Sequence, residues 1–332
     1  MENAITKEAE EVQKGSVDYL IHNKSIWLGL AIILIVFYHM PRVSPILNIF
    51  NPGFIGVDFF LFFSGFSLCY SYEKNKVVAF YRRRFFRIYP MYFILATIIS
   101  VMPICRGGGI SLLSWFCNIT TLSYYKIGGS FVDWYLSSIF LFYLLFPLLY
   151  AVTKKFKWIV PITVSLLLLI IISAYDIHWW YGCAIGRLPI FLLGIFCFLD
   201  DSYDKRSFKK CCWFFFFVFL IAVFLYRKGY YMRGYFLTDM ITPVLLLSIS
   251  LLLSRINNCR FTLPSKILSL LGNYTLEIYV ANVITMVFLG YNSIIQKGWQ
   301  ILLVYFAVTV LLSIILVIIN RCVRRILVHN FK

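Results

Sequence analysis

Apolar segments of nearly membrane-spanning length follow one another along almost the whole chain. We count about ten of them, each close to the roughly 20 residues with which an α-helix crosses the hydrocarbon core of a bilayer. The chain has 332 residues, of which 61% are hydrophobic and 14% charged, and its mean hydropathy is +0.83, which argues against a soluble domain. We therefore expect an all-α polytopic protein of the cell membrane. The segments lie near residues 26–45, 53–72, 85–105, 131–152, 158–175, 184–200, 211–226, 236–254, 268–290 and 299–320.

The sequence offers no point at which to divide the chain into several domains. No segment repeats at a fixed period, and no Pro/Gly/Ser-rich linker separates two parts. Residues 1–25 are polar and of mixed charge, without the basic start, short apolar run and small-residue cleavage site of a secretory signal. We expect one membrane domain, residues 26–320, between a short cytoplasmic tail, residues 1–25, and a basic cytoplasmic tail, residues 321–332.

The Lys and Arg side chains indicate the orientation of this domain. If the N-terminus is cytoplasmic, 23 of the 31 Lys and Arg side chains fall on cytoplasmic segments. Such a bias is the signature of the inner side of a membrane protein, so we expect both termini to be cytoplasmic. The formal net charge of +17 lies between apolar segments rather than along one face, and we therefore expect no nucleic-acid partner.

A histidine and an aspartate stand inside the first two apolar segments, where ionisable side chains are costly and are functional-site hypotheses by default. At 1.5 Å per residue, His39 lies about 20 Å along the first segment, in its outer third. By the same rise, Asp58 lies about 8 Å below the outer start of the second segment, which runs in the opposite direction. Both side chains should therefore reach a similar depth. A neutral histidine there can act as general base for an acceptor hydroxyl, with a carboxylate to fix its tautomer.

Further polar side chains converge on the same outer half of the membrane. Trp134 and Arg187 lie near the outer starts of the fourth and sixth segments. Asn282 lies about 20 Å along the ninth segment, and Glu277 lies deeper in it. Two interpretations stay open at this point: a shared polar cavity, or separate hydrogen bonds that each join two helices.

A basic cluster ends the charged loop after the second segment. The guanidinium groups of Arg83, Arg84 and Arg87 suit the phosphate oxygens of a cytoplasmic donor. Positive-inside anchoring explains the same cluster without any ligand. The residues alone leave both interpretations open.

Several common catalytic and metal-binding motifs are missing from the sequence. It contains no GxSxG elbow, no HExxH and no P-loop lysine motif, and its nine cysteines form no CxxC pair. We expect no metal. Of the four histidines, His39 alone falls within a predicted span, so acid–base chemistry would depend on it.

Four sequence blocks stand in order along the chain and together span roughly residues 24–290. They are the apolar helix ending in His39; GFIGVDFFLFFSGF, from Gly53 to Phe66; FYRRRFFRIYPMY, from Phe80 to Tyr92; and a diffuse set formed by WYLSSIFLFYLLFPLL from Trp134, RLPIFLLGI from Arg187 and LLGNYTLEIYVANV from Leu270. In these blocks the chain resembles the membrane-bound acyltransferase family 3, which includes polysaccharide O-acetyltransferases. Members of that family move acyl groups, usually acetyl from acetyl-CoA, onto surface glycans and related acceptors.

This resemblance implies acyl transfer across the bilayer. Acetyl-CoA or another acyl-CoA would bind at the inner face, and a surface polysaccharide or lipid-linked glycan would present a hydroxyl from the outer side. By position in the blocks, His39 matches the catalytic histidine of the family, and Asp58 matches the acid that would orient it or stabilise its imidazolium. The donor-binding residues would be Arg83, Arg84 and Arg87, and the supporting residues Trp134, Arg187, Glu277 and Asn282.

The chain departs from the family pattern at several positions. Leu28 stands eleven residues before His39, where the family commonly has an arginine, and Lys24 lies about one helical turn further back. Many members have glutamates where this chain has Ile139 and Phe140. Asn282 stands where a histidine often occurs, and an asparagine takes up no proton at neutral pH.

Two other function classes remain compatible with the sequence. A transporter or flippase of a lipid-linked glycan or small solute would use the same intramembrane His and Asp without acyl chemistry. A structural subunit of an envelope assembly would tolerate His39→Ala without a phenotype. Dependence on an acyl-CoA donor discriminates the acyltransferase from both.

Overall fold

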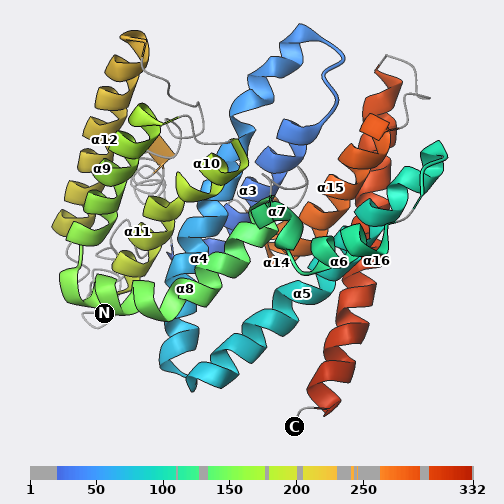
Figure 1. The fold of residues 1–332 in the computed structure, drawn as a ribbon, viewed down its shortest axis with the longest axis horizontal. Coiled ribbons are helices and arrows are strands. Elements are labelled where there is room, and N and C mark those ends of the chain that lie inside the picture. Colours follow the sequence, from blue (N-terminus) through green and yellow to red (C-terminus); the bar gives the residue numbers. More distant parts are fainter. Residues whose placement is uncertain are drawn as a thin grey trace, which may run out of the picture.

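The chain forms a bundle of helices in the computed structural model (Figure 1). The structure describes residues 21–109, 111–126, 134–175, 179–199, 205–229, 241–242, 245, 262–291 and 299–330. Within these residues every regular element is a helix, which confirms the all-α prediction. The elements are α3 (Lys24–His39), η1 (Pro45–Ile55), α4 (Gly56–Glu73), α5 (Val77–Val101), η2 (Met102–Arg106), α6 (Leu112–Ile119), α7 (Leu122–Lys126), α8 (Trp134–Phe156), α9 (Ile159–Ala174), α10 (Trp179–Ile185), α11 (Leu188–Leu199), α12 (Lys205–Arg227), α14 (Thr262–Asn273), α15 (Thr275–Tyr291) and α16 (Gln300–Asn330).

Six helical stretches in the described part of the chain are long and apolar enough to cross a membrane. The bent pair α14 and α15 makes a seventh if it counts as one span, and the apolar helices α3 and α9 are shorter, at 16 residues each. The predicted segment 236–254 lies almost wholly outside the described residues. The count of ten and the cytoplasmic position of both termini therefore stay predictions. The six stretches are Pro45–Glu73, Val77–Ile104, Trp134–Phe156, Tyr181–Leu199, Lys210–Arg227 and Gln300–Ile326.

Several predicted segments differ from the helices observed. Helix α5 begins at Val77 rather than near residue 85, so the arginines predicted to end a loop lie within a helix. Helix α16 continues past residue 320 to Asn330. The sequence predicts a first segment to residue 45, whereas α3 ends at His39 because Met40 is extended (φ −63°, ψ 150°) ahead of Pro41. The sequence also predicts one continuous helix over 268–290, whereas α14 and α15 are bent by 77° at Tyr274. Gly and Asn, the last two residues of α14, are poor helix formers, which favours a break there.

Helix α4 begins inside the bundle. Every side chain from Val57 to Phe63 is buried, so this part of the helix is enclosed on all sides. The helix packs against both α3 and α11. Its approach to α11 depends on two glycines, since a Cβ would lie 2.2 Å from the Phe191 carbonyl oxygen at Gly65 and 2.1 Å from the Phe62 carbonyl oxygen at Gly194.

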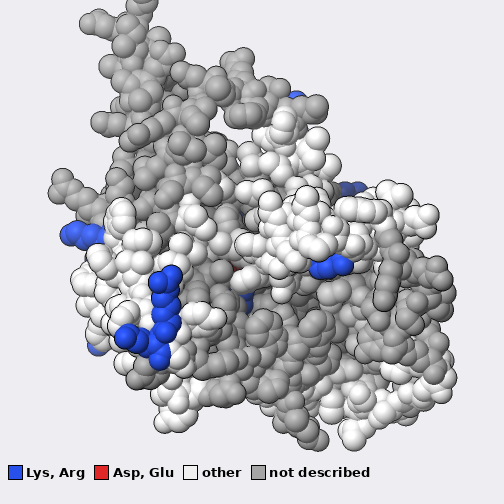
Figure 2. All heavy atoms as spheres, turned by 90° about the horizontal axis from the view of Figure 1, so that it is seen from above, with Lys and Arg blue, Asp and Glu red and all other residues white. Residues whose placement is uncertain are grey.

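Charged side chains are sparse on the face that Figure 2 shows. Most of the described residues there are drawn white, with Lys and Arg in a few places. Helix α16 exposes large apolar side chains, among them Val310 and Leu311, which are 56% and 60% exposed. Apolar side chains on the outside are the expected arrangement where lipid rather than water is the solvent.

Candidate active site

His39 occupies the last position of α3, and a line of hydrogen bonds from two other helices reaches its ring. His39 Nδ1 lies 2.7 Å from Asn282 Oδ1 of α15. Asn282 Nδ2 donates to the hydroxyl of Tyr305 on α16, and this hydroxyl donates to the Val36 carbonyl oxygen at 2.8 Å. Asn282 and Tyr305 are fully buried, whereas His39 is half-buried. The partner of His39 is therefore Asn282, which the sequence analysis places among the supporting residues.

Arg42 closes the end of α3 that carries His39. Its guanidinium donates to the carbonyl oxygens of Phe37 at 3.1 Å and Tyr38 at 2.8 Å. The last carbonyl groups of a helix have no partner within the helix, so these bonds fix its final turn. In the sequence, Arg42 is one of the eight Lys and Arg side chains that fall outside the predicted cytoplasmic segments. Its position three residues after His39 and next to Pro41 is the signal that points to a capping role.

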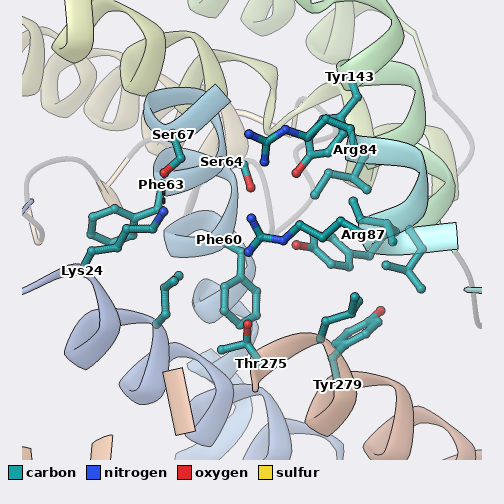
Figure 3. A pocket seen from close by; sticks show the side chains of 16 residues that line it. Lys24, Phe60, Phe63, Ser64, Ser67, Arg84, Arg87, Tyr143, Thr275 and Tyr279 are labelled. Carbon is teal, nitrogen blue, oxygen red and sulfur yellow. Dashed lines mark hydrogen bonds between the residues drawn. The ribbon is translucent and has the colours of Figure 1, made fainter. Parts of the chain in front are cut away.

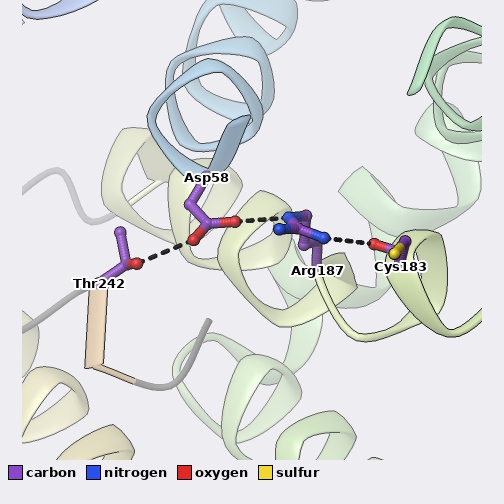
Figure 4. Close-up of polar contacts among 4 residues, drawn as sticks. All are labelled: Asp58, Cys183, Arg187 and Thr242. Atoms are coloured by element: carbon purple, nitrogen blue, oxygen red, sulfur yellow. Dashed lines mark hydrogen bonds and ion pairs between the residues drawn. The ribbon is translucent and has the colours of Figure 1, made fainter. Parts of the chain in front are cut away.

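Asp58 and Arg187 form a buried ion pair (Figure 4). Arg187 Nε lies 2.7 Å from Asp58 Oδ1, and the two side chains are 1% and 0% exposed. Thr242 Oγ1 donates to Asp58 Oδ2 at 2.9 Å, and Arg187 Nη1 donates to the Cys183 carbonyl oxygen at 2.9 Å. Asp58 is predicted to orient His39 or to stabilise its imidazolium, whereas the described contacts of this carboxylate are with Arg187 and Thr242. An arginine is the strongest partner open to a buried carboxylate, and it takes that place here.

Two aromatic rings flank the guanidinium of Arg187. The ring of Trp134, the first residue of α8, lies 5.2 Å from the guanidinium carbon, and the ring of Phe54 lies 5.8 Å from it. Both distances are within the range of a cation–π interaction. Trp134 and Arg187, predicted as supporting residues, thus lie together with Asp58 in one buried cluster.

A small pocket of about 100 Å³ opens beside the N-terminal end of α3 (Figure 3). The cationic groups of Lys24, Arg84 and Arg87 point into it from two helices. None of the 16 lining side chains described for this pocket is acidic. The Arg84 Nε–H is buried and has no hydrogen-bond partner among the described residues, while Lys24 Nζ donates to Ser67 Oγ. Such an excess of positive charge suits an anionic ligand.

Part of the pocket lining is aromatic. Phe60, Tyr135 and Tyr279 belong to it, and the Tyr135 ring centroid lies 5.1 Å from that of Tyr279 and 6.3 Å from that of Phe60. Tyr135 follows Trp134 directly in α8, so this aromatic wall adjoins the Asp58–Arg187 cluster through neighbouring residues. The lining of the pocket thus combines cationic and aromatic side chains.

The remaining predicted residues lie apart from the pocket. Arg83 is exposed and is not among its lining residues, in contrast to Arg84 and Arg87. Glu277 is 5% exposed and accepts a hydrogen bond from Asn320 Nδ2 of α16, so its observed contact joins two helices.

Two departures from the family pattern, Leu28 and Ile139, line the pocket. Lys24, one helical turn from Leu28, lies in the same lining.

Within the described residues, no group of three or more His, Cys, Asp and Glu side chains is placed to hold a metal ion. The site contains three kinds of group. They are a histidine with an amide partner, a carboxylate in an ion pair with an arginine, and a pocket lined by cationic and aromatic side chains. These groups are suited to proton transfer and to binding an anion.

Comparison with known proteins gives one family match. A family model described as an acyltransferase domain matches residues 29–318. The chain is similar to the acyltransferase MdmB of Streptomyces mycarofaciens, with 35% identity over 128 residues, 34% of this chain and 32% of that protein. It is also similar to a putative acetyltransferase, ORF330, of Acidianus two-tailed virus, with 27% identity over 166 residues, 48% of this chain and 47% of that protein. The chain thus covers less than half the length of either relative. No solved structure matches it.

Proposed function

This chain belongs to the acyltransferase domain family, and from that premise we propose a donor, an acceptor and a catalytic base. The donor is a cytoplasmic acyl-CoA, in the first instance acetyl-CoA. The acceptor is a hydroxyl of a cell-surface polysaccharide or of its lipid-linked precursor. The base is His39.

The basic pocket is the observation that carries the proposal. Coenzyme A bears its phosphates at one end and its thioester at the end of a long, flexible arm. Lys24, Arg84 and Arg87 supply cations for the phosphates, and the Arg84 Nε–H supplies a buried donor that has no partner among the described residues. The aromatic wall formed by Phe60, Tyr135 and Tyr279 suits the uncharged arm and acyl group. Arg83, a predicted donor-binding residue, would act from outside this lining.

The transfer needs one proton to move and one bond to be exchanged. His39 takes the proton of the acceptor hydroxyl, and the hydroxyl oxygen attacks the carbonyl carbon of the thioester. A carbon–oxygen bond forms, the carbon–sulfur bond breaks, and the thiolate of CoA recovers the proton from the imidazolium. The alternative route through an acyl-enzyme would use the same base.

The ion pair bears on the transporter alternative. A proton-coupled transporter would use a carboxylate that gains and loses a proton during its cycle. Both oxygens of the Asp58 carboxylate have partners, Arg187 at one and Thr242 at the other. These contacts support a structural role for the carboxylate rather than that of a proton carrier.

Binding of acetyl-CoA to the purified protein in lipid nanodiscs tests the proposal. We expect the native protein to bind acetyl-CoA, and Arg84→Gln and Arg87→Gln each to raise the Kd about tenfold or more, because a charge-assisted hydrogen bond contributes about 1.5–3 kcal/mol. Acetyl-pantetheine, which lacks the phosphates of CoA, should bind the native protein far more weakly. Isothermal titration calorimetry gives these constants.

Arg325→Gln is the matched control, since it removes the same charge from an exposed position on α16. Its Kd should equal that of the native protein. The donor assignment is wrong if the native protein does not bind acetyl-CoA, or if all three variants bind it equally well.

A further inference from the structure

The line of hydrogen bonds that ends at His39 has a direction. It begins at the Val36 carbonyl oxygen. A carbonyl oxygen can only accept a hydrogen bond, so the Tyr305 hydroxyl must donate its proton to it. The Tyr305 oxygen is then left to accept from Asn282 Nδ2. This orients the Asn282 amide with Oδ1 toward the ring of His39.

The orientation of the amide decides where the imidazole carries its proton. An amide oxygen only accepts, so the 2.7 Å contact requires a proton on His39 Nδ1. In the neutral ring the other nitrogen, Nε2, then holds the lone pair that a general base needs. If Nδ1 carried no proton, two hydrogen-bond acceptors, Nδ1 and the buried Asn282 Oδ1, would face each other at 2.7 Å, which is costly.

We propose that Tyr305 is a positioning residue that fixes the Nδ1–H tautomer of His39 through Asn282. The proposal rests on the function assigned to His39 above and adds a residue to it. In the transfer step, the proton of the acceptor hydroxyl arrives at Nε2, and the Nδ1–H bond to Asn282 persists in the imidazolium. This line of hydrogen bonds, which we call the relay, therefore keeps the same donors and acceptors throughout the reaction. It also needs no carboxylate beside the ring.

The same contacts admit a purely structural interpretation, in which Tyr305 and Asn282 only join α16, α15 and α3. Both interpretations predict some loss of stability when the tyrosine hydroxyl is removed, because Asn282 Nδ2 then loses its acceptor. They differ in what happens to the ring of His39. Only the positioning role predicts a change of tautomer in a variant that still folds.

Nitrogen NMR of histidine in nanodiscs distinguishes the two. The chain contains four histidines, so ring-labelled histidine gives few signals, and loss of one signal in His39→Gln assigns His39. Above the imidazole titration, we expect native His39 in the Nδ1–H form and Tyr305→Phe with a substantial Nε2–H population. Tyr92→Phe is the matched control, since Tyr92 is also fully buried and donates to a backbone carbonyl, that of Asn118. Its His39 tautomer should equal the native one.

Kinetics provide a second readout. Tyr305→Phe should lower kcat about tenfold, the low end of what losing an orienting partner of a functional histidine costs, and leave the KM for acyl-CoA unchanged. A native His39 in the Nε2–H form, or the same tautomer in native protein and Tyr305→Phe, overturns the positioning role. If the tautomers behave as expected while no acyl transfer is found in any variant, the relay stands and the proposed function fails.

Discussion

At the scale of single residues, two polar contacts define the site, one between His39 and Asn282 and one between Asp58 and Arg187. The rise of a helix gives the height of His39 and Asp58 along their helices, but not the direction in which each side chain points. Direction decides the partners: His39 meets Asn282, and Asp58 meets Arg187. Tyr305 lies in an apolar segment without any motif, so nothing in the sequence marks it as the residue behind Asn282.

Removing only one member of the Asp58–Arg187 pair should destabilise the protein more than removing both. Asp58→Asn or Arg187→Gln alone leaves one buried charge without its partner, and we expect each to lower the free energy of unfolding by about 3 kcal/mol. The double variant should recover part of this loss, because neither charge remains. Thermal unfolding of the purified native protein, the two single variants and the double variant measures these differences in stability. A double variant as unstable as the two losses added together would show that the two side chains act independently.

At the scale of elements, apolar run length places the helices, and local chemistry moves their ends. All the predicted segments except 236–254 overlap a described helix. Pro41 stops α3 at His39 and so puts the histidine at a helix end, where Arg42 and Tyr305 reach its last carbonyl groups. The break between α14 and α15 is not visible in hydropathy, because both halves are apolar enough to read as one span.

The contact between α4 and α11 should tolerate no side chain at its closest point. In Gly194→Ala the new Cβ would lie 2.1 Å from the Phe62 carbonyl oxygen, so the two helices must separate. We expect a clear fall in Tm and in the yield of folded protein. Gly109→Ala is the control, since a Cβ there meets nothing within 4 Å. Equal Tm values for the two variants would contradict the packing described here, and fluorescence-detected chromatography after heating measures them.

At the scale of the whole molecule, composition predicts an all-helical membrane protein, but the pocket depends on tertiary structure. Its lining comes from α3, α4, α5, α8 and α15, segments separated by up to about 250 residues. Resemblance to the family selects Arg84 and Arg87 together with Arg83, and the folded chain separates Arg83 from the other two. Lys24 joins them because the start of α3 lies beside α4, as its bond to Ser67 shows.

The proposed activity of this chain is acyl transfer with His39 as the base. The most direct measurement is the ester-linked acetate on the surface polysaccharide of cells that express the native chain, His39→Ala, His22→Ala or no protein, with membrane levels checked in parallel. We predict acetate with the native chain and with His22→Ala, an exposed histidine outside the site, and background levels with His39→Ala. Equal acetate in native and His39→Ala cells, with both proteins inserted, would contradict the account.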